Sequence, residues 1–439
     1  MMKLGVVSLG CDKATVDSER LVGELVSRGA RVVEDAEEAD VLLINTCGFI
    51  DAAKQESIDT ILQAAELKRS GRVKAVVAVG CLVQRYRDEL AREIPEVDLF
   101  LGFDAIDRLV PALASKGFLG GQPGPVHPRR FYLGESPHVR YLKISEGCDH
   151  GCAFCAIPLM RGRHRSEPVE QIVREAQMLE AQGAREINLV AQDLAHYGRD
   201  FGREGPKLPD LLETLLRETK VPWFRLLYVY SSGITPRLLE LMASEKRIVP
   251  YIDMPIQHAS DRMLKRMRRP ERRETIREKV QLLRDSVPDI AIRTTVIVGF
   301  PGETEEDFRC LVDFVEEMGF EHLGVFTYSP QEGTRAALEP DDVPDEVKRQ
   351  RQEELIEVQR VIAAERLARF AGREVEVLVD RIAEPDEEGA THVGRVPWQA
   401  DDVDGITYVE RGGWARPGDF VRALIVGNLD GDFRAVAVP

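Results

Sequence analysis

Three closely spaced cysteines constrain this chain more than any other feature of its sequence. They stand at the spacing C-x3-C-x2-C, and they are Cys148, Cys152 and Cys155. The next cysteine is Cys310, so no fourth thiolate follows at ligand distance. A structural zinc site needs four protein ligands, whereas three thiolates suit an iron–sulfur cluster with one open iron. We therefore predict a reactive iron–sulfur site, with a zinc site completed by His150 or His164 as the alternative.

The composition of the chain limits the classes of protein to which it can belong. Its 439 residues are 44% hydrophobic, which predicts two to four domains with buried cores. The formal net charge of −16 argues against nucleic-acid binding by the whole surface. The chain has seven cysteines, no secretory leader and no apolar run near the roughly 18 residues of a membrane span. We therefore expect a cytoplasmic protein that keeps its thiolates for metal.

The first segment, residues 1–118, repeats one pattern three times. An apolar run ends each time in a cysteine, and these are Cys11, Cys47 and Cys81. Helical patterns follow, for example over residues 17–28 and 53–69. Continuous apolar strands between amphipathic helices predict a doubly wound parallel sheet, whose ligands bind beyond the carboxyl ends of the strands. All three cysteines would occupy that edge, which predicts a second metal cluster. The alternative is three inert buried thiols.

The second segment, residues 139–371, follows a Pro- and Gly-rich linker at residues 119–138. It alternates strand and helix patterns six times, with strands expected over residues 141–145, 187–192, 224–230, 251–256, 292–298 and 323–328. A long charged helix follows, over about residues 345–370. Six units are too few for a closed eight-fold barrel, so we predict a partial (β/α)6 TIM-like barrel. Cys148 comes soon after the first strand, at the end where this architecture places its chemistry.

Polar or glycine-bearing residues follow the other expected strands of this barrel. They include Gln192 with Asp193, Gln257 with His258, and the turn from Gly299 through Gly302 to Glu303. In a half-open barrel these residues converge on one cavity beside the cysteine motif. We expect them to line a cofactor site, and the alternative for each single residue is ordinary loop chemistry.

The last segment, residues 372–439, changes character. Short β-rich runs appear at residues 375–379, 405–409, 420–426 and 434–438, and Gly and Pro separate them. About five short strands in fewer than 70 residues predict a small, OB-like β-barrel.

These features together resemble the radical-SAM methylthiotransferase family, where SAM is S-adenosylmethionine. Members join an N-terminal cluster domain, a radical-SAM domain and a C-terminal TRAM barrel, and the similarity covers the whole chain. The cysteine motif, with Phe154 before its last cysteine, is typical of the radical-SAM part. The resemblance implies two 4Fe–4S clusters and SAM as cofactors. An auxiliary cluster would be held by Cys11, Cys47 and Cys81, and the SAM cluster by Cys148, Cys152 and Cys155.

The resemblance also guides the remaining site residues. Cys310 matches no family ligand, so we expect a core cysteine. SAM is expected across the ends of the second, fourth and fifth strands of the barrel. The candidate contacts there are Gln192, Asp193, Gln257 and Arg293.

The family has two main substrate branches. One modifies an adenosine of transfer RNA, and the other an aspartate of ribosomal protein S-twelve. Strings at residues 8–11, 45–50, 141–148, 255–260 and 326–330 are similar to the ribosomal-protein branch. One string departs from it, because Asp12-Lys13-Ala14-Thr15 stands where Pro-Lys-Asn-Leu is usual.

The resemblance implies a radical reaction, since acid–base groups cannot activate an unactivated C–H bond. A flavodoxin- or ferredoxin-like donor would supply electrons to the SAM cluster, and SAM would split to methionine and a deoxyadenosyl radical. That radical would take hydrogen from the β-carbon of the target aspartate. Sulfur at the auxiliary cluster and a methyl group from a second SAM would complete a 3-methylthio-aspartate.

Charge separates the two branches. Residues 372–439 hold 14 acidic and 7 basic residues. We expect Asp401, Asp402 and Asp404 to be exposed and to help bind a basic partner, and the alternative is that they only solubilise a loop. An RNA-binding barrel should be basic, whereas an acidic barrel suits a basic ribosomal protein. Seven basic residues from Arg262 to Arg273 argue the other way, unless they form a solvated helix face. A tRNA enzyme and a non-catalytic iron–sulfur or zinc scaffold remain the alternatives.

Overall fold

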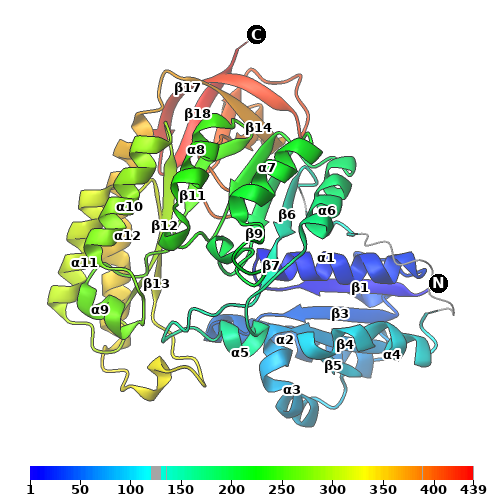
Figure 1. Ribbon diagram of the computed structural model, residues 1–439. Coiled ribbons are helices and arrows are strands. Elements are labelled where there is room, and N and C mark those ends of the chain that lie inside the picture. The colour runs from blue at the N-terminus through cyan, green and yellow to red at the C-terminus, as the bar shows by residue number, and fades with distance from the viewer. Residues whose placement is uncertain (120–129, 135, 388, 439) are drawn as a thin grey trace.

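The computed structural model describes residues 1–119, 130–134, 136–387 and 389–438. Three units follow one another along the chain: a five-stranded sheet, a six-stranded sheet and a closed barrel (Figure 1). Most of the predicted linker, residues 119–138, lies outside the described residues. Within the described residues, no helix is long and apolar enough to cross a membrane.

The N-terminal unit is a doubly wound parallel sheet, as predicted. Its strand order is β2-β1-β3-β4-β5, with β1 Lys3–Ser8, β2 Arg31–Val32, β3 Val41–Thr46, β4 Ala75–Gly80 and β5 Leu99–Leu101. One face packs against α1 (Asp12–Ser27) and α4 (Leu109–Ser115). The other face packs against α2 (Asp51–Arg69) and α3 (Cys81–Glu93). Two helix layers explain why β3 and β4 are buried at every position.

The central unit is an open barrel of six parallel strands in the order β13-β12-β11-β10-β9-β6. The strands are β6 Val139–Lys143, β9 Glu186–Val190, β10 Trp223–Leu226, β11 Ile248–Asp253, β12 Ala291–Val298 and β13 His322–Thr327. The helices are α5 Ile157–Arg161, α6 Val169–Ala181, α7 Leu208–Glu218, α8 Pro236–Ser244, α9 Asp261–Arg266, α10 Arg273–Ser286 and α11 Glu305–Met318. A short ribbon, β7 (Ser145–Glu146) with β8 (Arg165–Ser166), was not predicted.

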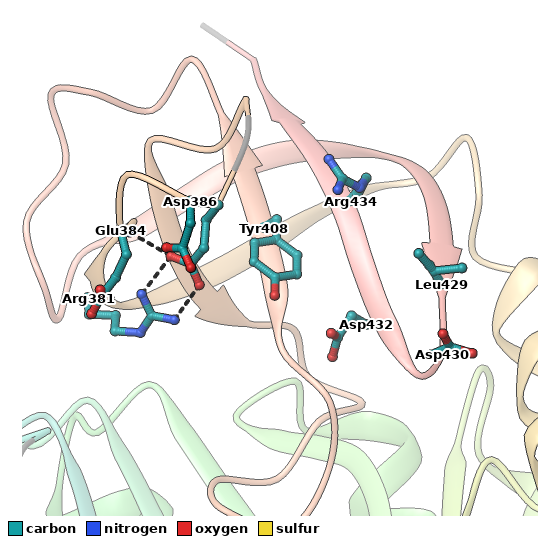
Figure 2. A pocket seen from close by; sticks show the side chains of 9 residues that line it. Arg381, Glu384, Asp386, Tyr408, Leu429, Asp430, Asp432 and Arg434 are labelled. Atoms are coloured by element: carbon teal, nitrogen blue, oxygen red, sulfur yellow. Dashed lines mark hydrogen bonds and ion pairs between the residues drawn. The ribbon is translucent and has the colours of Figure 1, made fainter.

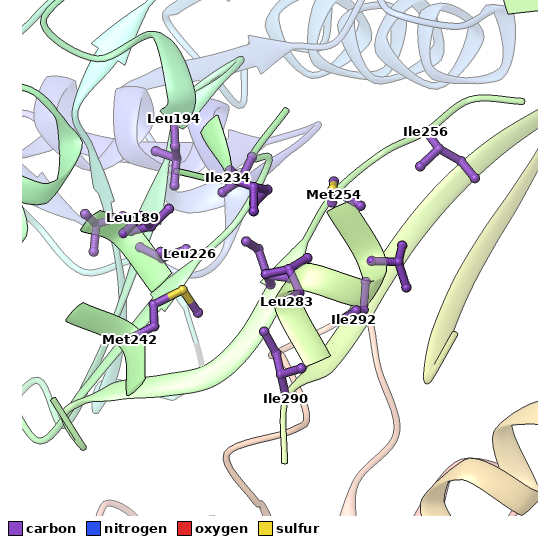
Figure 3. Close-up of a cluster of buried hydrophobic side chains, with 14 of the residues drawn as sticks. Leu189, Leu194, Leu226, Ile234, Met242, Met254, Ile256, Leu283, Ile290 and Ile292 are labelled. Atoms are coloured by element: carbon purple, nitrogen blue, oxygen red, sulfur yellow. The ribbon is translucent and has the colours of Figure 1, made fainter. Parts of the chain in front are cut away.

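The main core lies between the strands of the central barrel and the helices outside it (Figure 3). Along β12 the side chains alternate: Ile292 and Val296 join this core, while Arg293 and Thr295 are only half-buried. Burial of each Leu or Ile in such a core contributes about 1.5–3 kcal/mol. The alternation therefore fixes which residues of each strand face the barrel interior.

The C-terminal unit is a closed five-stranded barrel that follows the long helix α12 (Asp345–Ala368). Its strands are β14 Glu374–Ile382, β15 His392–Arg395, β16 Thr407–Glu410, β17 Phe420–Leu429 and β18 Asp432–Ala437. The sequence patterns located four of these strands and missed β15. That strand is only four residues long and contains Gly394, so it carries little β signal.

A loop of the C-terminal barrel, residues 396–404, packs against the central barrel. Trp398 joins Trp223 and Tyr251 in one apolar cluster. Buried ion pairs surround this cluster, since Glu186 lies 2.7 Å from both Arg225 and Arg395. Glu186 and Trp223 are the first residues of β9 and β10, and Arg225 is the third residue of β10. The loop therefore covers the end of the barrel opposite the strand carboxyl ends.

The expectation of an exposed acidic loop at residues 401–404 was wrong for Asp404. Its side chain is fully buried and lies 2.9 Å from Arg293 Nη1. Tyr251 donates its hydroxyl to the same carboxylate at 2.7 Å. Asp401 is mostly enclosed near Arg395, and only Asp402 of the three is exposed. Sequence alone could not reveal this, because the partners of Asp404 come from distant strands.

Candidate active site between two cysteine triads

The loop that carries the C-x3-C-x2-C motif is held by its backbone. Gly147 opens it at φ 78°, and a Cβ there would meet the carbonyl oxygen of Arg163 at 2.1 Å. Only glycine fits that position. Cys148 N donates to the carbonyl of Gly162 at 3.1 Å. The three thiols of the motif, here called the SAM triad, are therefore presented from a constrained loop.

The other three cysteines follow three adjacent parallel strands, β1, β3 and β4. Cys11, Cys47 and Cys81, here called the auxiliary triad, thus meet at one edge of the N-terminal sheet. Gly80 has φ 102°, and a Cβ there would meet the side-chain oxygen of Asn45 at 2.3 Å. This close packing of β4 on β3 brings Cys81 beside Cys47.

The thiol spacing fits two multinuclear clusters. In the described part of the chain, neither triad has all three Sγ atoms within 4.8 Å of one another. Zinc–sulfur bonds of about 2.3 Å would draw them closer than that. The histidines considered as zinc ligands are engaged elsewhere, because His150 Nε2 lies 2.7 Å from Asp193 and His164 Nε2 lies 3.0 Å from Ser166. Three free thiols per triad therefore fit a 4Fe–4S cluster with one open iron.

Burial raises the pKa of several of these thiols. The pKa of Cys81 rises to about 11, that of Cys148 to about 11 and that of Cys155 to about 12. Burial also raises the pKa of Cys47. These thiols are therefore protonated at neutral pH in the metal-free protein, so metal binding releases protons.

Cys152 has two polar neighbours, one from the end of the third expected strand of the barrel and one from the basic stretch Arg262 to Arg273, and the sequence did not pair either of them with this cysteine. The Tyr230 hydroxyl lies 3.3 Å from Cys152 Sγ, and Arg269 Nη1 donates to the same sulfur at 3.9 Å. The Arg269 guanidinium lies 3.9 Å from the ring centroid of Tyr230. On the other side the His150 ring stacks on Tyr230 at 3.8 Å. Donors of this kind stabilise a thiolate and orient a cluster ligand.

Three of the predicted SAM residues lie where strands of the barrel end. Gln192 donates its Nε2 to Glu146 at 3.0 Å, and its Oε1 is buried without a partner in the described part of the chain. The Asp193 carboxylate accepts the backbone N–H groups of Ala195 and Tyr230 as well as binding His150. Gln257 has φ 70° and bonds to β12 through its backbone. Their contact with SAM remains a prediction.

The expected place of Arg293 at the carboxyl end of its strand was wrong. Arg293 is the third residue of β12 and pairs with Asp253 at the same level of β11. Its Nη1 binds Asp404 of the C-terminal barrel. The residue therefore lies deep in the barrel, and a contact with SAM from there remains a prediction.

Three known families match successive parts of the chain. The uncharacterized protein family UPF0004 matches residues 3–102, the radical SAM superfamily residues 142–315, and the TRAM domain residues 371–438. The chain is 45% identical to the ribosomal protein uS12 methylthiotransferase RimO of Geobacter sulfurreducens, over 98% of this chain and 97% of that protein. It is 48% identical to the RimO of Anaeromyxobacter sp. strain Fw109-5, over 95% and 89%.

This chain belongs to the RimO family. Two solved structures that resemble the chain are more distant in sequence and show the fold alone. The radical SAM methyltransferase TsrM from Kitasatospora setae aligns with TM-score 0.55 at 15% identity, covering 75% of this chain and 74% of that one. The cobalamin-dependent radical SAM enzyme OxsB aligns with TM-score 0.52 at 14% identity, covering 81% and 56%.

The string in which this chain departs from the usual RimO-branch pattern makes a contact between units. Asp12 accepts a hydrogen bond from the Tyr228 hydroxyl at 3.1 Å. Lys13 Nζ lies 3.3 Å from the centroid of the same ring. Tyr228 has φ 63° and donates its backbone N–H to Asp253, and burial raises the pKa of Asp253 to about 6. Asp12, which departs from the usual string, and Lys13, which agrees with it, therefore join the start of α1 to the barrel interior.

Several strand-end residues of this RimO-family chain have structural partners. His258 is fully buried, and its Nε2 lies 2.9 Å from Glu303. Glu303 also accepts the backbone N–H of Gly299 and pairs with Arg351. Gly302 has φ 75°, which permits the tight turn. These contacts leave His258 and Glu303 with few free polar atoms, and their place in the wall of a cofactor site remains a prediction.

The basic stretch from Arg262 to Arg273 is largely paired within the chain. Arg262 binds Asp307, Arg266 binds Glu339 and Arg273 binds Glu317. Arg273 also lies 3.3 Å from the half-buried Cys310, which is remote from both triads in sequence. The pairing favours a structural role for this stretch in the RimO-family fold.

Proposed function

We propose that this chain methylthiolates the β-carbon of an aspartate in ribosomal protein S-twelve, with SAM as co-substrate. The observation that carries the proposal is the pair of cysteine triads, each with three free thiols, on two units that pack together. A single triad would support a simpler radical-SAM reaction. Two triads supply places for both SAM cleavage and sulfur transfer, which is the combination that methylthiolation requires.

The residues would divide the work between the two sites. Cys148, Cys152 and Cys155 would hold the SAM cluster, and Cys11, Cys47 and Cys81 the auxiliary cluster. When bound, the two clusters would supply the electron that cleaves SAM and the sulfur that is transferred. A low-potential flavodoxin- or ferredoxin-like protein would deliver that electron. We further propose functional units at residues 1–118, 139–371 and 372–439; the first two family matches lie within their units, and the TRAM match begins one residue before the third.

The chain itself would orient SAM and exclude water. Gln192, Asp193 and Gln257 lie at strand ends of the central barrel, and Gln192 keeps one buried oxygen without a partner among the described residues. The start of α1 meets the barrel at Tyr228, and Cys11 of the auxiliary triad immediately precedes α1, so two units bound the space near this triad. Enclosure of this kind protects a substrate radical from solvent.

The proposal is tested with anaerobically reconstituted protein, SAM, a low-potential reductant and purified S-twelve. Peptide mass spectrometry should find one methylthio group on a single aspartate. A matched reaction with unmodified transfer RNA should leave every nucleoside unchanged. Methylthio-adenosine in that arm, with no change in S-twelve, would establish the transfer-RNA alternative instead.

The charge of the C-terminal barrel favours the protein substrate. A hollow of about 610 Å³ lies on this barrel, and its lining holds five acidic and two basic residues. Figure 2 shows acidic side chains on both sides of Tyr408, with Glu384 and Asp386 on one side and Asp430 and Asp432 on the other. An RNA backbone would be repelled there, whereas a basic protein surface fits in sign.

Charge reversal in this hollow tests its role in docking S-twelve. We expect Glu384→Lys with Asp430→Lys to weaken binding of S-twelve and to leave uncoupled SAM cleavage unchanged. Glu376→Lys is the matched control, because Glu376 is exposed on β14 outside the hollow. If the double variant and Glu376→Lys bound S-twelve equally well, the charge of this hollow would no longer argue against a transfer-RNA substrate.

A further inference from the structure

The short helix α5 connects the two cysteine triads in space. It begins two residues after Cys155, at the end of the SAM triad. Ala156 and Met160 pack against Cys81 of the auxiliary triad, with Phe103 beside them. Figure 1 shows α5 where the central barrel meets the N-terminal sheet. One element of the radical-SAM unit therefore reaches the auxiliary triad directly.

Arg161, the last residue of α5, is buried in this boundary. Its side chain is 2% exposed. Nη1 donates to Asp17 at 2.6 Å and to Glu146 at 3.0 Å. The guanidinium lies 4.3 Å from the ring centroid of Phe103. The cation is thus fixed by three neighbours from both units.

The second terminal nitrogen of Arg161 has no such partner. Nη2 is buried and finds no hydrogen-bond acceptor at normal geometry among the described residues. An unmet buried donor costs about 1–3 kcal/mol, so its persistence calls for an acceptor. Met160, the residue before Arg161, packs against Cys81, and the thiols of Cys81 and Cys11 act to raise the pKa of the Arg161 guanidinium. Arg161 opposes the rise that burial causes in the pKa of Cys81 and of Cys47.

The two carboxylates that bind Arg161 do not by themselves explain why an arginine stands at this position. Lys143 Nζ pairs with Glu146 at 2.6 Å and also pairs with Asp17. A lysine therefore already supplies a buried cation to both acids. Arg161 differs from a lysine in its planar guanidinium group: Nη1 can bind both acids while Nη2 donates to a different acceptor.

We infer that Arg161 is a positioning residue for the auxiliary cluster, donating its Nη2–H to cluster sulfur on the side of Cys81. A hydrogen bond to sulfur stabilises the more negative, reduced state of an iron–sulfur cluster and raises its reduction potential. A residue of the radical-SAM unit would in this way set the reduction potential and the position of the auxiliary cluster, whose cysteine ligands belong to the N-terminal unit. The inference rests on the proposed function only in requiring a cluster on the auxiliary triad.

The test uses full-length protein in which Cys148, Cys152 and Cys155 are replaced by Ala, so that only the auxiliary cluster remains. Redox titration followed by electron paramagnetic resonance measures the midpoint potential of that cluster. In this background we compare four proteins: one with Arg161 unchanged, Arg161→Gln, Arg161→Lys and the matched control Lys143→Gln. The control disturbs the same two carboxylates and leaves the donor to sulfur in place.

We expect Arg161→Gln to shift the midpoint potential to more negative values and Arg161→Lys to recover part of the shift. Lys143→Gln should leave the potential near that of the unchanged Arg161 protein. Loss of the auxiliary iron in Arg161→Gln alone would also support the inference. Equal potentials in all four proteins, or equal shifts in Arg161→Gln and Lys143→Gln, would overturn it. If the protein with Arg161 unchanged held no iron, the proposal of a cluster on the auxiliary triad would itself be refuted.

Discussion

Removal of the Asp404 side chain should loosen the C-terminal barrel from the central barrel. The carboxylate is fully buried, and it binds Arg293 at 2.9 Å, the Tyr251 hydroxyl at 2.7 Å and the Ala400 N–H at 2.8 Å. Asp404→Ala leaves the partly buried Arg293 cation with Asp253, 3.9 Å away, as its remaining carboxylate, so the loss should be about 3 kcal/mol, the low end for a broken buried pair. Asp404→Asn keeps the shape and one acceptor oxygen but loses the charge, so it should cost about 1.5–3 kcal/mol.

Urea unfolding followed by tryptophan fluorescence measures this effect, because Trp223 and Trp398 both lie in the interface. Asp402→Asn is the matched control: Asp402 is exposed two residues away, and asparagine tolerates its φ of 61°. The control should change the free energy of unfolding by less than about 0.5 kcal/mol. An Asp404→Ala protein as stable as this control would refute the reasoning.

Acid should reduce the difference between Asp404→Asn and the unchanged protein. Burial acts to raise the pKa of Asp404, but His322 and Arg293 outweigh it and lower that pKa. A depressed carboxyl pKa contributes stability above the unfolded pKa of about 3.9 and loses it as the pH falls. The gap measured at pH 7 should therefore narrow below about pH 4.

Three further predictions concern the clusters, SAM and the pH dependence. The reconstituted protein should hold about eight irons, as measured by iron analysis. The variant with Ala at all three positions of the SAM triad should hold about four irons and should release no methionine from SAM. Gln192→Ala and Gln257→Ala should each weaken SAM binding by about 2- to 10-fold in calorimetry, the range for one lost hydrogen bond; unchanged affinity in both would reject the predicted placement. Burial raises the pKa of Asp401 to about 6, so the folded state favours its protonated form and loses stability as pH rises from about 4 to about 6. Asp401→Asn should therefore gain about 1–3 kcal/mol over the unchanged protein above pH 6 and nothing near pH 4, and a gain that did not depend on pH would contradict this.

Much of the N-terminal unit could be predicted because its signals are local. Each apolar run ends in a cysteine, and parallel strands place those ends at one edge, so the meeting of Cys11, Cys47 and Cys81 followed from strand order alone. The same reasoning placed Gln192 and Gln257 at strand ends. Periodicity within one segment carries this information.

The contacts between units could not be predicted in this way. Glu186 and Arg395 are 209 positions apart in sequence and pair at 2.7 Å, and no local pattern links them. Arg293 was chosen as a SAM contact because it belongs to the fifth strand of the barrel. Its position within that strand, third from the start, is what brings it to Asp404. Arg269 lies in the basic stretch that could form a solvated helix face, and no local pattern singles out Arg161. Only packing shows that both side chains are buried.

The loop at residues 396–404 sets the order in which a newly made chain can reach its folded form. Arg395 leaves the ribosome 209 residues after Glu186, a delay of roughly 10–40 s at usual rates of synthesis. During that time the buried acid of β9 has Arg225 but not its second cation, and Trp223 and Tyr251 lack their cover from Trp398. The middle of the protein is thus completed by residues made last. Chains cut short before residue 395 would retain both cysteine triads yet expose an unfinished apolar surface, which marks them for aggregation or proteolysis.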